Sequence, residues 1–182
     1  MSSEDQGSRQ VALIRGINVG KAKRIAMADL RALMERLGYS DCRTLLNTGN
    51  VIFTTERQSP DSNAVRIGQA LEADLGVAAP VIALSAAEFS TVVRECPLVE
   101  IAENPSRLLV SFLLDPTDRD RLEPLGREDW GSEDFALGSR AAYLWCPDGV
   151  LESRLPAAVE RALGKAVTTR NWKTVTKIQG LL

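Results

Sequence analysis

A loop with two glycines and two flanking cations stands directly after the first apolar run of the chain. The run at 11–14 stops at Arg15 and Gly16, and Gly20 and Lys21 follow. Glycines let backbone amides approach an anion and the cations add charge, so this pattern is typical of a phosphate-binding loop. Three residues rather than four separate the glycines, which excludes a nucleotide P-loop. The alternative is a structural turn in which Asn18 bonds to its own backbone.

The end of the chain carries a second group of cations beside a predicted helix start. Asn171 is a favourable N-cap, and the free amides at a helix start attract anions. Arg170 precedes it, and Lys173 and Lys177 share one helix face at a spacing of four residues. Trp172 is a candidate to stack on a base, although an aromatic ring beside apolar positions is more often part of a core.

The polar turn at 47–50 is a third candidate. Its two asparagine amides and one hydroxyl suit a polar ligand, but Asn and Gly are also what a tight hairpin turn requires, so the structural interpretation is favoured here. Together the three segments supply the candidate ligand-binding residues Arg15, Gly16, Asn18, Gly20, Lys21, Asn50, Arg170, Asn171, Trp172, Lys173 and Lys177.

The composition removes several classes of catalytic site. The 182 residues include no histidine, which excludes imidazole acid–base chemistry and histidine-ligated metals. Three widely spaced cysteines, Cys42, Cys96 and Cys146, form neither a metal-binding knuckle nor a disulfide framework. We therefore expect no metal, no cofactor and a reduced, cytoplasmic protein. An enzyme would need another base, for which Glu152 and Lys177 are the nominees.

Charge is distributed unevenly, although the formal net charge is only −2. Residues 15–24 contain four cations and residues 161–182 contain five, in both cases without an acid, whereas residues 115–134 contain eight acids and three arginines. The basic ends suit an outside anion or the acidic segment of a second copy. The first ten residues are polar, and no apolar run approaches the roughly 20 residues that cross a bilayer, so we expect no membrane association.

Periodicity predicts the element order β-α-β-β-α-β twice. The first set has strand-like runs at 11–14, 43–46, 51–54 and 81–84, with helical patterns at 27–37 and 61–75. The second set has strand-like runs at 108–114, 134–137, 141–146 and 166–169, with helical patterns at 117–125 and 155–163. A capping box, Ser85 with Glu88, starts a helix between the two sets. The prediction is an α+β fold, a tandem duplication of ferredoxin-like units with antiparallel sheets, plus a connector helix and a C-terminal helix.

The predicted division of the chain follows from this order. Residues 1–10 form a disordered tail, 11–84 the first ferredoxin-like unit, 85–106 a connector helix and loop, and 107–182 the second unit with the C-terminal helix.

These segments together resemble the bacterial domain-of-unknown-function family 1697. The resemblance is carried by residues 13–20, 27–33, 43–44 and 48–53, and by residues 143–145, 147–149, 153–155, 169–172, 174–175 and 177. Lys21, Thr48 and Arg154 stand where glycine, serine and lysine are usual in the family. The resemblance implies a duplicated α+β fold and no established activity.

Three functions stay open at this point. The leading hypothesis is that the basic segments 15–24 and 170–177 meet in space and bind a phosphate-bearing ligand, either a nucleotide or nucleic acid. One alternative is an enzyme acting on an anionic metabolite without histidine or metal, with Arg15, Lys21, Arg170 and Lys173 as anion holders. The other is a protein-interaction module, in which the acidic segment docks on the basic ends of another copy to form a homodimer.

Overall fold

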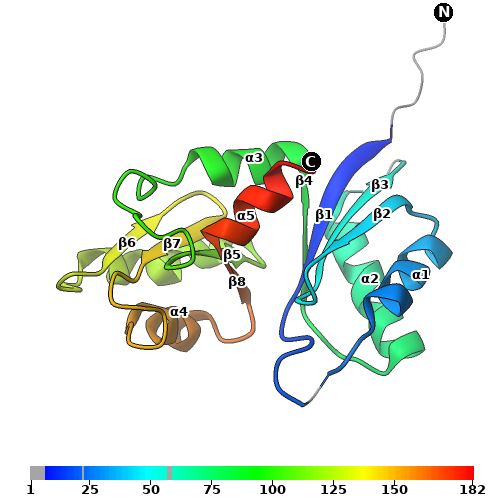
Figure 1. The fold of residues 1–182 in the computed structure, drawn as a ribbon, viewed down its shortest axis with the longest axis horizontal. Helices are drawn as coiled ribbons and strands as arrows, with labels where there is room; N and C mark the ends of the chain where they lie inside the picture. The colour runs from blue at the N-terminus through cyan, green and yellow to red at the C-terminus, as the bar shows by residue number, and fades with distance from the viewer. Residues whose placement is uncertain (1–6, 22, 57–58) are drawn as a thin grey trace, which may run out of the picture. The chain divides into compact units, whose positions relative to one another are not determined.

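The computed structural model describes residues 7–21, 23–56 and 59–182. The chain divides into two compact units, the first formed by Met1–Phe89 with Gly180–Leu182 and the second by Ser90–Gln179. Each unit contains a four-stranded antiparallel sheet with helices packed on it (Figure 1). The predicted α+β class is therefore confirmed.

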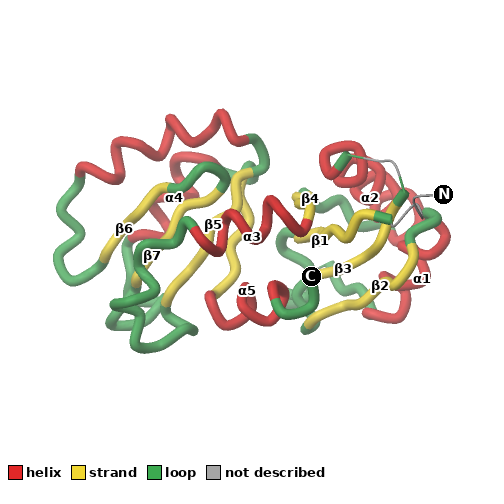
Figure 2. Tube along the Cα trace, turned by 90° about the horizontal axis from the view of Figure 1, so that it is seen from above, coloured by secondary structure: helices red, strands yellow, loops and turns green. Residues whose placement is uncertain are grey.

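The first unit places its two long helices on one side of its sheet. Strands β1 (Ser8–Ile14), β2 (Ser40–Leu45), β3 (Asn50–Thr55) and β4 (Val81–Ser85) are arranged in the order β2-β3-β1-β4. Helices α1 (Met27–Arg36) and α2 (Pro60–Leu75) lie on the same side of these strands, as Figures 1 and 2 show. Alternate residues of a strand point to the same face, so Ala12, Ile14, Val51 and Phe53 form one core with the buried helix residues.

Residues close in the sequence set the end of α1 and the start of α2. In α1, Leu30, Leu33 and Met34 are buried on one face, and the chain turns at Gly38 with φ of 86°. In α2, the Ser59 hydroxyl accepts a hydrogen bond from the Ser62 amide at 3.3 Å. That bond satisfies one of the free amides of the first turn, which is why serine is favoured at this position.

The second unit contains β5 (Leu108–Leu113), β6 (Asp134–Leu137), β7 (Ala141–Trp145) and β8 (Val167–Asn171), in the order β6-β7-β5-β8. Helix α4 (Leu155–Leu163) and helix α5 (Trp172–Gln179) lie on opposite faces of this sheet (Figure 1). On the α4 side, Leu109 and Leu144 of the strands pack with Leu155, Val159 and Leu163. The unit therefore has the same connection order as the first.

The segment after β5 differs from its prediction. The sequence pattern predicts an α-helix at 117–125, whereas the structure has a 3-10 helix, η1 (Pro116–Arg127). Pro124 lies inside this element and has no N–H to donate to an α-helical acceptor. The Asp115 carboxylate starts the element by accepting from the Thr117 amide at 2.8 Å. Leu122 and Leu125 are buried as predicted.

The chain passes between the two units inside helix α3 (Ala86–Arg94), because the units divide after Phe89. The predicted capping box is confirmed: the Ser85 amide donates to Glu88 Oε2 at 2.8 Å, and the Glu88 amide donates to the Ser85 hydroxyl at 3.2 Å. The sequence places this whole helix in a separate connector, whereas in the structure each unit takes part of it.

The N-terminal boundary also differs from the prediction. Strand β1 begins at Ser8, inside the predicted tail, because Gln10 is buried and its Oε1 accepts a hydrogen bond from Asn63 Nδ2 at 2.9 Å. Arg9 Nη1 donates to the carbonyl of Leu181 at 3.1 Å, so the last residues of the chain belong with the first unit. Residues 1–6 of the predicted tail lie outside the described residues.

No helix among the described residues is both long enough and apolar enough to span a membrane.

Candidate anion-binding sites

The loop that follows β1 repeatedly enters the left-handed backbone region. Gly16, Asn18 and Gly20 have φ values of 68°, 56° and 66°. Left-handed residues at alternate positions make the backbone of this loop turn repeatedly. Glycine enters this region without the steric cost of a Cβ. The two glycines singled out in the sequence therefore shape this loop.

Asn18 holds the loop in place with its side-chain amide. Its Nδ2 donates to the carbonyls of Ile25 at 2.9 Å and Asn47 at 2.8 Å, and its Oδ1 accepts from the Ile25 amide at 2.9 Å. Its backbone amide donates to the carbonyl of Lys23 at 3.1 Å. These bonds occupy the carboxamide, so Asn18 has a structural role in the loop, and contact with a ligand at this position stays a prediction.

The β2–β3 turn packs against the same loop. The Ile14 amide donates to the carbonyl of Gly49 at 2.8 Å, and a Cβ on Gly49 would lie 2.9 Å from the Ile14 Cβ. Asn50 is fully buried, and its Nδ2 donates to the Leu45 carbonyl at 2.9 Å and to the Thr48 hydroxyl at 3.1 Å. Asn50 thus closes the hairpin, and its role as a ligand contact stays a prediction.

Cations and one apolar side chain are exposed on this loop. Lys21, Lys23 and Arg24 are exposed, and Val19 is 68% exposed. Lys23 Nζ donates to the carbonyl of Ala78 at 2.8 Å, which ties the loop to the segment before β4. Lys21 and Arg24 form no ion pair with any residue that the structure describes. Their charge is therefore directed to solvent.

Arg15 is half-buried at the end of β1, and its amide donates to the carbonyl of Pro80 at 2.9 Å. The structure thus brings Arg15, Gly16, Gly20 and Lys21 together at one end of the first sheet, supported by Asn18 and the hairpin turn. We call residues 15–24 the basic loop.

The start of α5 is already occupied by partners within the second unit. Asn171 Oδ1 accepts from the Thr174 amide at 2.9 Å, as predicted for an N-cap. The Lys173 amide donates to the carbonyl of Pro105 at 3.2 Å. Trp172 is buried, so the core interpretation is the correct one for this ring. Two of the amides expected to bind an anion are therefore used by the protein, while the Lys173 and Lys177 side chains are exposed.

Arg170 lies on β8 and is half-buried. Its Nη1 donates to the Thr168 hydroxyl at 3.0 Å and to the Thr169 carbonyl at 2.9 Å. Burial lowers the pKa of the guanidinium to about 10, which leaves Arg170 charged at neutral pH. The group is therefore an oriented cation held against its own strand.

The cysteines are poor nucleophiles. Burial raises the pKa of all three thiols, and the charges of Glu35 and Asp41 add to the effect at Cys42, whose pKa is about 11. Only the thiolate attacks an electrophile, so little of the reactive form exists at neutral pH. The two nominated bases, Glu152 and Lys177, are exposed.

A groove in the second unit was missed by the sequence reasoning. It has a volume of about 650 Å³ and is lined by Leu125, Glu128, Trp130, Ser153, Arg154, Ala157, Ala158, Arg161 and Ala162. The sequence offered one signal for it: Arg154 and Arg161 are seven residues apart, or about two helical turns, and so share one face of α4. Trp130, another lining residue, belongs to the acidic segment 115–134.

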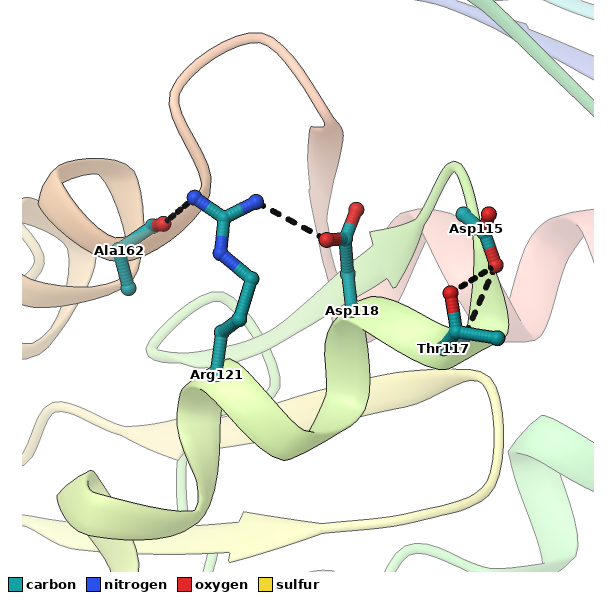
Figure 3. A network of polar contacts seen from close by, with 5 residues as sticks. All are labelled: Asp115, Thr117, Asp118, Arg121 and Ala162. Carbon is teal, nitrogen blue, oxygen red and sulfur yellow. Dashed lines mark hydrogen bonds and ion pairs between the residues drawn. The ribbon is translucent and has the colours of Figure 1, made fainter.

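Arginines of that acidic segment pair locally and hold it against α4. Arg119 contacts Glu123 at 3.0 Å and Arg121 contacts Asp118 at 2.9 Å. Figure 3 shows that Arg121 also reaches from η1 to donate to the carbonyl of Ala162 near the end of α4. Arg121 thus links η1 to the end of α4, beside the groove.

Comparison with known proteins gives a family and a fold. The family model described as a protein of unknown function (DUF1697) matches residues 8–143, which is most of the chain. No curated protein matches. Among solved structures, a conserved bacterial protein from Streptococcus pneumoniae is similar, with a TM-score of 0.79, 21% identity, and coverage of 96% of this chain and 98% of that chain. At this identity the likeness concerns the fold alone.

Proposed function

We propose that this chain, which belongs to the DUF1697 family, binds the phosphate groups of nucleic acid through the basic loop. The observation that carries the proposal is the pair of exposed cations Lys21 and Arg24, which have no ion-pair partner among the described residues. An exposed cation that is not neutralised by the protein can replace the counterions of a phosphate chain, and the release of those counterions drives binding.

The shape of the loop supports the same interpretation. Asn18 bonds the loop to the β2–β3 turn and Lys23 bonds it to Ala78, so the cations are mounted on a braced segment rather than on a loose one. A braced segment loses less conformational entropy when a ligand binds.

A phosphate chain fits these residues better than a single nucleotide does. The ring proposed for stacking, Trp172, is buried, and the amides at the start of α5 bond to Asn171 and Pro105. What remains accessible is side-chain charge: Lys21 and Arg24 in the first unit, and Lys173 and Lys177 in the second. Charge without base readout produces binding that is sequence-independent and strongly salt-dependent.

We also infer that the two units are ferredoxin-like copies produced by tandem duplication. The support is topological: the first unit has strand order β2-β3-β1-β4 and the second has β6-β7-β5-β8, and both follow the element order expected for this fold. Under this inference, the basic loop and the segment that holds η1 occupy corresponding positions, each after the first strand of its unit.

The test is a fluorescence-anisotropy titration of the full chain with a short labelled DNA duplex at a series of salt concentrations. Each phosphate contact adds roughly 0.9 to the steepness of log K against log salt, so the double variant Lys21→Gln/Arg24→Gln should lose about two contacts and a slope of about 1.8. ATP at the same ionic strength should bind weakly and with a shallow salt dependence.

The matched control is Lys165→Gln/Arg94→Gln, which removes the same two residue types from exposed positions outside the basic loop. This control should leave the slope unchanged. Failure of the native chain to bind duplex at low salt would refute the proposal, as would equal losses in the double variant and the control.

A further inference from the structure

The groove in the second unit has the size and the walls of a small-molecule site. Its volume of about 650 Å³ lies within the range of roughly 300–1,000 Å³ that is usual for such sites. Leu125 and Ala158 line it and are buried, whereas Ala157 lines it and is exposed. The small alanine side chains leave room beside α4 for a flat apolar body.

The aromatic wall of the groove is fixed by a hydrogen bond. Trp130 Nε1 donates to the carbonyl of Leu125 at 2.8 Å, which orients the ring. The guanidinium carbon of Arg154 lies 5.3 Å from the centre of that ring, within the range of a cation–π contact. One cation is therefore held at the wall of the groove by a contact that needs no carboxylate.

The charge of the groove is net positive. Arg154 and Arg161 both line it, and their spacing places them roughly 10 Å apart along one side of α4. Glu128 is the one acid among the lining residues. The nearby Glu133 carboxylate is used by the protein, since it accepts from the Ser153 hydroxyl at 2.7 Å and from the Arg154 amide at 3.3 Å.

Arg161 is the cation that is available to a ligand. It is exposed and forms no ion pair with any described residue. It belongs to the last turn of α4, where a cation also interacts favourably with the helix dipole, but that role does not require a groove beside it. The neighbouring end of α4 is held by Arg121 at Ala162 (Figure 3).

We propose that this groove binds a small organic anion. The flat apolar body of the ligand lies against Trp130 and the alanines of α4, and its anionic group pairs with Arg161. Apolar surface provides most of the binding free energy, and one oriented charge provides selectivity. This site is independent of the basic loop, which lies in the other unit and binds through charge alone under the proposal above.

The test compares two probes with the same ring system: anilinonaphthalene sulfonate, which is anionic, and N-phenyl-1-naphthylamine, which is neutral. Fluorescence titration of the full chain should show one saturable site for the sulfonate and markedly weaker binding of the neutral probe. Arg161→Gln should weaken the sulfonate by roughly three- to tenfold and leave the neutral probe unchanged. Ala157→Phe fills the groove from an exposed position and should abolish binding of both probes.

The control for Ala157→Phe is Ala28→Phe, which adds the same ring at an exposed helical position in the first unit. It should bind the sulfonate like the native chain, and thermal melting should show that both variants are folded. Equal affinity for the two probes, or unchanged binding in Ala157→Phe, would overturn the proposal. So would sedimentation showing that the native chain forms a dimer that Ala157→Phe dissociates, because a second copy would then be the occupant.

Discussion

Two residues with left-handed backbones join the β2–β3 turn to β1 and to the basic loop. Asn18, with φ of 56°, reaches the turn through its side chain, and Gly49, with φ of 77°, reaches β1 through its carbonyl. The two positions differ in what fixes the residue type. Asn18 is used for its three side-chain hydrogen bonds, whereas Gly49 is required because a Cβ there would lie 2.9 Å from the Ile14 Cβ and carbonyl oxygen.

Gly49→Ala should therefore lower the free energy of unfolding by about 2–4 kcal/mol, since it adds steric overlap to the cost of a left-handed alanine. Gly38→Ala is the matched control, because Gly38 also has a left-handed φ, of 86°, but no atom lies within 4 Å of a Cβ there. The control should lose only about 1 kcal/mol. Urea denaturation measures both, and equal losses would show that the Gly49 contact carries no cost.

Cys42 offers a residue-scale test by pH. Burial, with Glu35 and Asp41 nearby, raises the pKa of this thiol to about 11 from its ordinary value of 9.0. At pH 8 the thiolate fraction should be roughly a hundredfold lower in the folded chain than in the unfolded chain, so alkylation by iodoacetamide should be slow and should accelerate up to pH 11.

The same shift has a consequence for stability. The folded state retains the thiol proton above the pKa at which the unfolded state loses it, so the contribution of Cys42 to the free energy of unfolding is complete below pH 9 and is lost as pH rises toward 11.

Peptide-level mass spectrometry after iodoacetamide treatment measures the alkylation rate at Cys42, with the denatured chain as the control. A native midpoint near pH 9 would contradict the shift.

At the scale of elements, short-range hydrogen bonds mark where α2, α3 and α5 begin. The Ser85–Glu88 box starts α3, Ser59 starts α2 and Asn171 starts α5. Asp115 likewise starts η1, which is a 3-10 helix although its apolar spacing also suits an α-helix. Capping residues are thus readable from the sequence, whereas the apolar spacing does not distinguish a 3-10 helix from an α-helix.

Ser85→Ala should lower the free energy of unfolding by about 1 kcal/mol, because the Glu88 amide at the start of α3 loses its acceptor. Ser85→Thr retains the hydroxyl and should stay within a few tenths of a kcal/mol of the native chain. Thermal or urea unfolding compares the two variants. If the alanine and threonine variants are equally stable, the cap contributes nothing measurable to α3.

At the scale of the whole molecule, a net charge of −2 conceals two basic segments, one in each unit. That both segments bind one ligand stays a prediction from the sequence. It has a measurable form, because contacts with one phosphate chain add to a single salt slope. The charges concerned are those of Lys21 and Arg24 in the first unit and of Lys173 and Lys177 in the second.

Lys173→Gln/Lys177→Gln should reduce the slope for duplex DNA by about 1.8, as the variant of the basic loop does, and the fourfold variant should reduce it by about 3.6. Anisotropy titrations at several salt concentrations measure these slopes. An unchanged slope in the Lys173/Lys177 variant would restrict binding to the first unit.

The sequence alone determined the element order, the α+β class and the N-terminal caps of α3 and α5. These features depend on contacts between residues close in the chain: apolar spacing at Leu30, Leu33 and Met34, or the three-residue reach from Ser85 to Glu88. The first strand was placed three residues too late because the partner that buries Gln10 is Asn63, which lies 53 residues away.

Only the tertiary structure decided which polar residues are free to act. Asn18, Asn50 and Trp172 have types that suit a ligand, but distant neighbours or their own turn use them. Conversely, Trp130 and Arg154 are 24 positions apart in the sequence but lie in contact beside the groove. Neither segment by itself predicts this contact. The physical reason is that a side chain's chemistry is local, whereas its availability depends on what the folded chain brings against it.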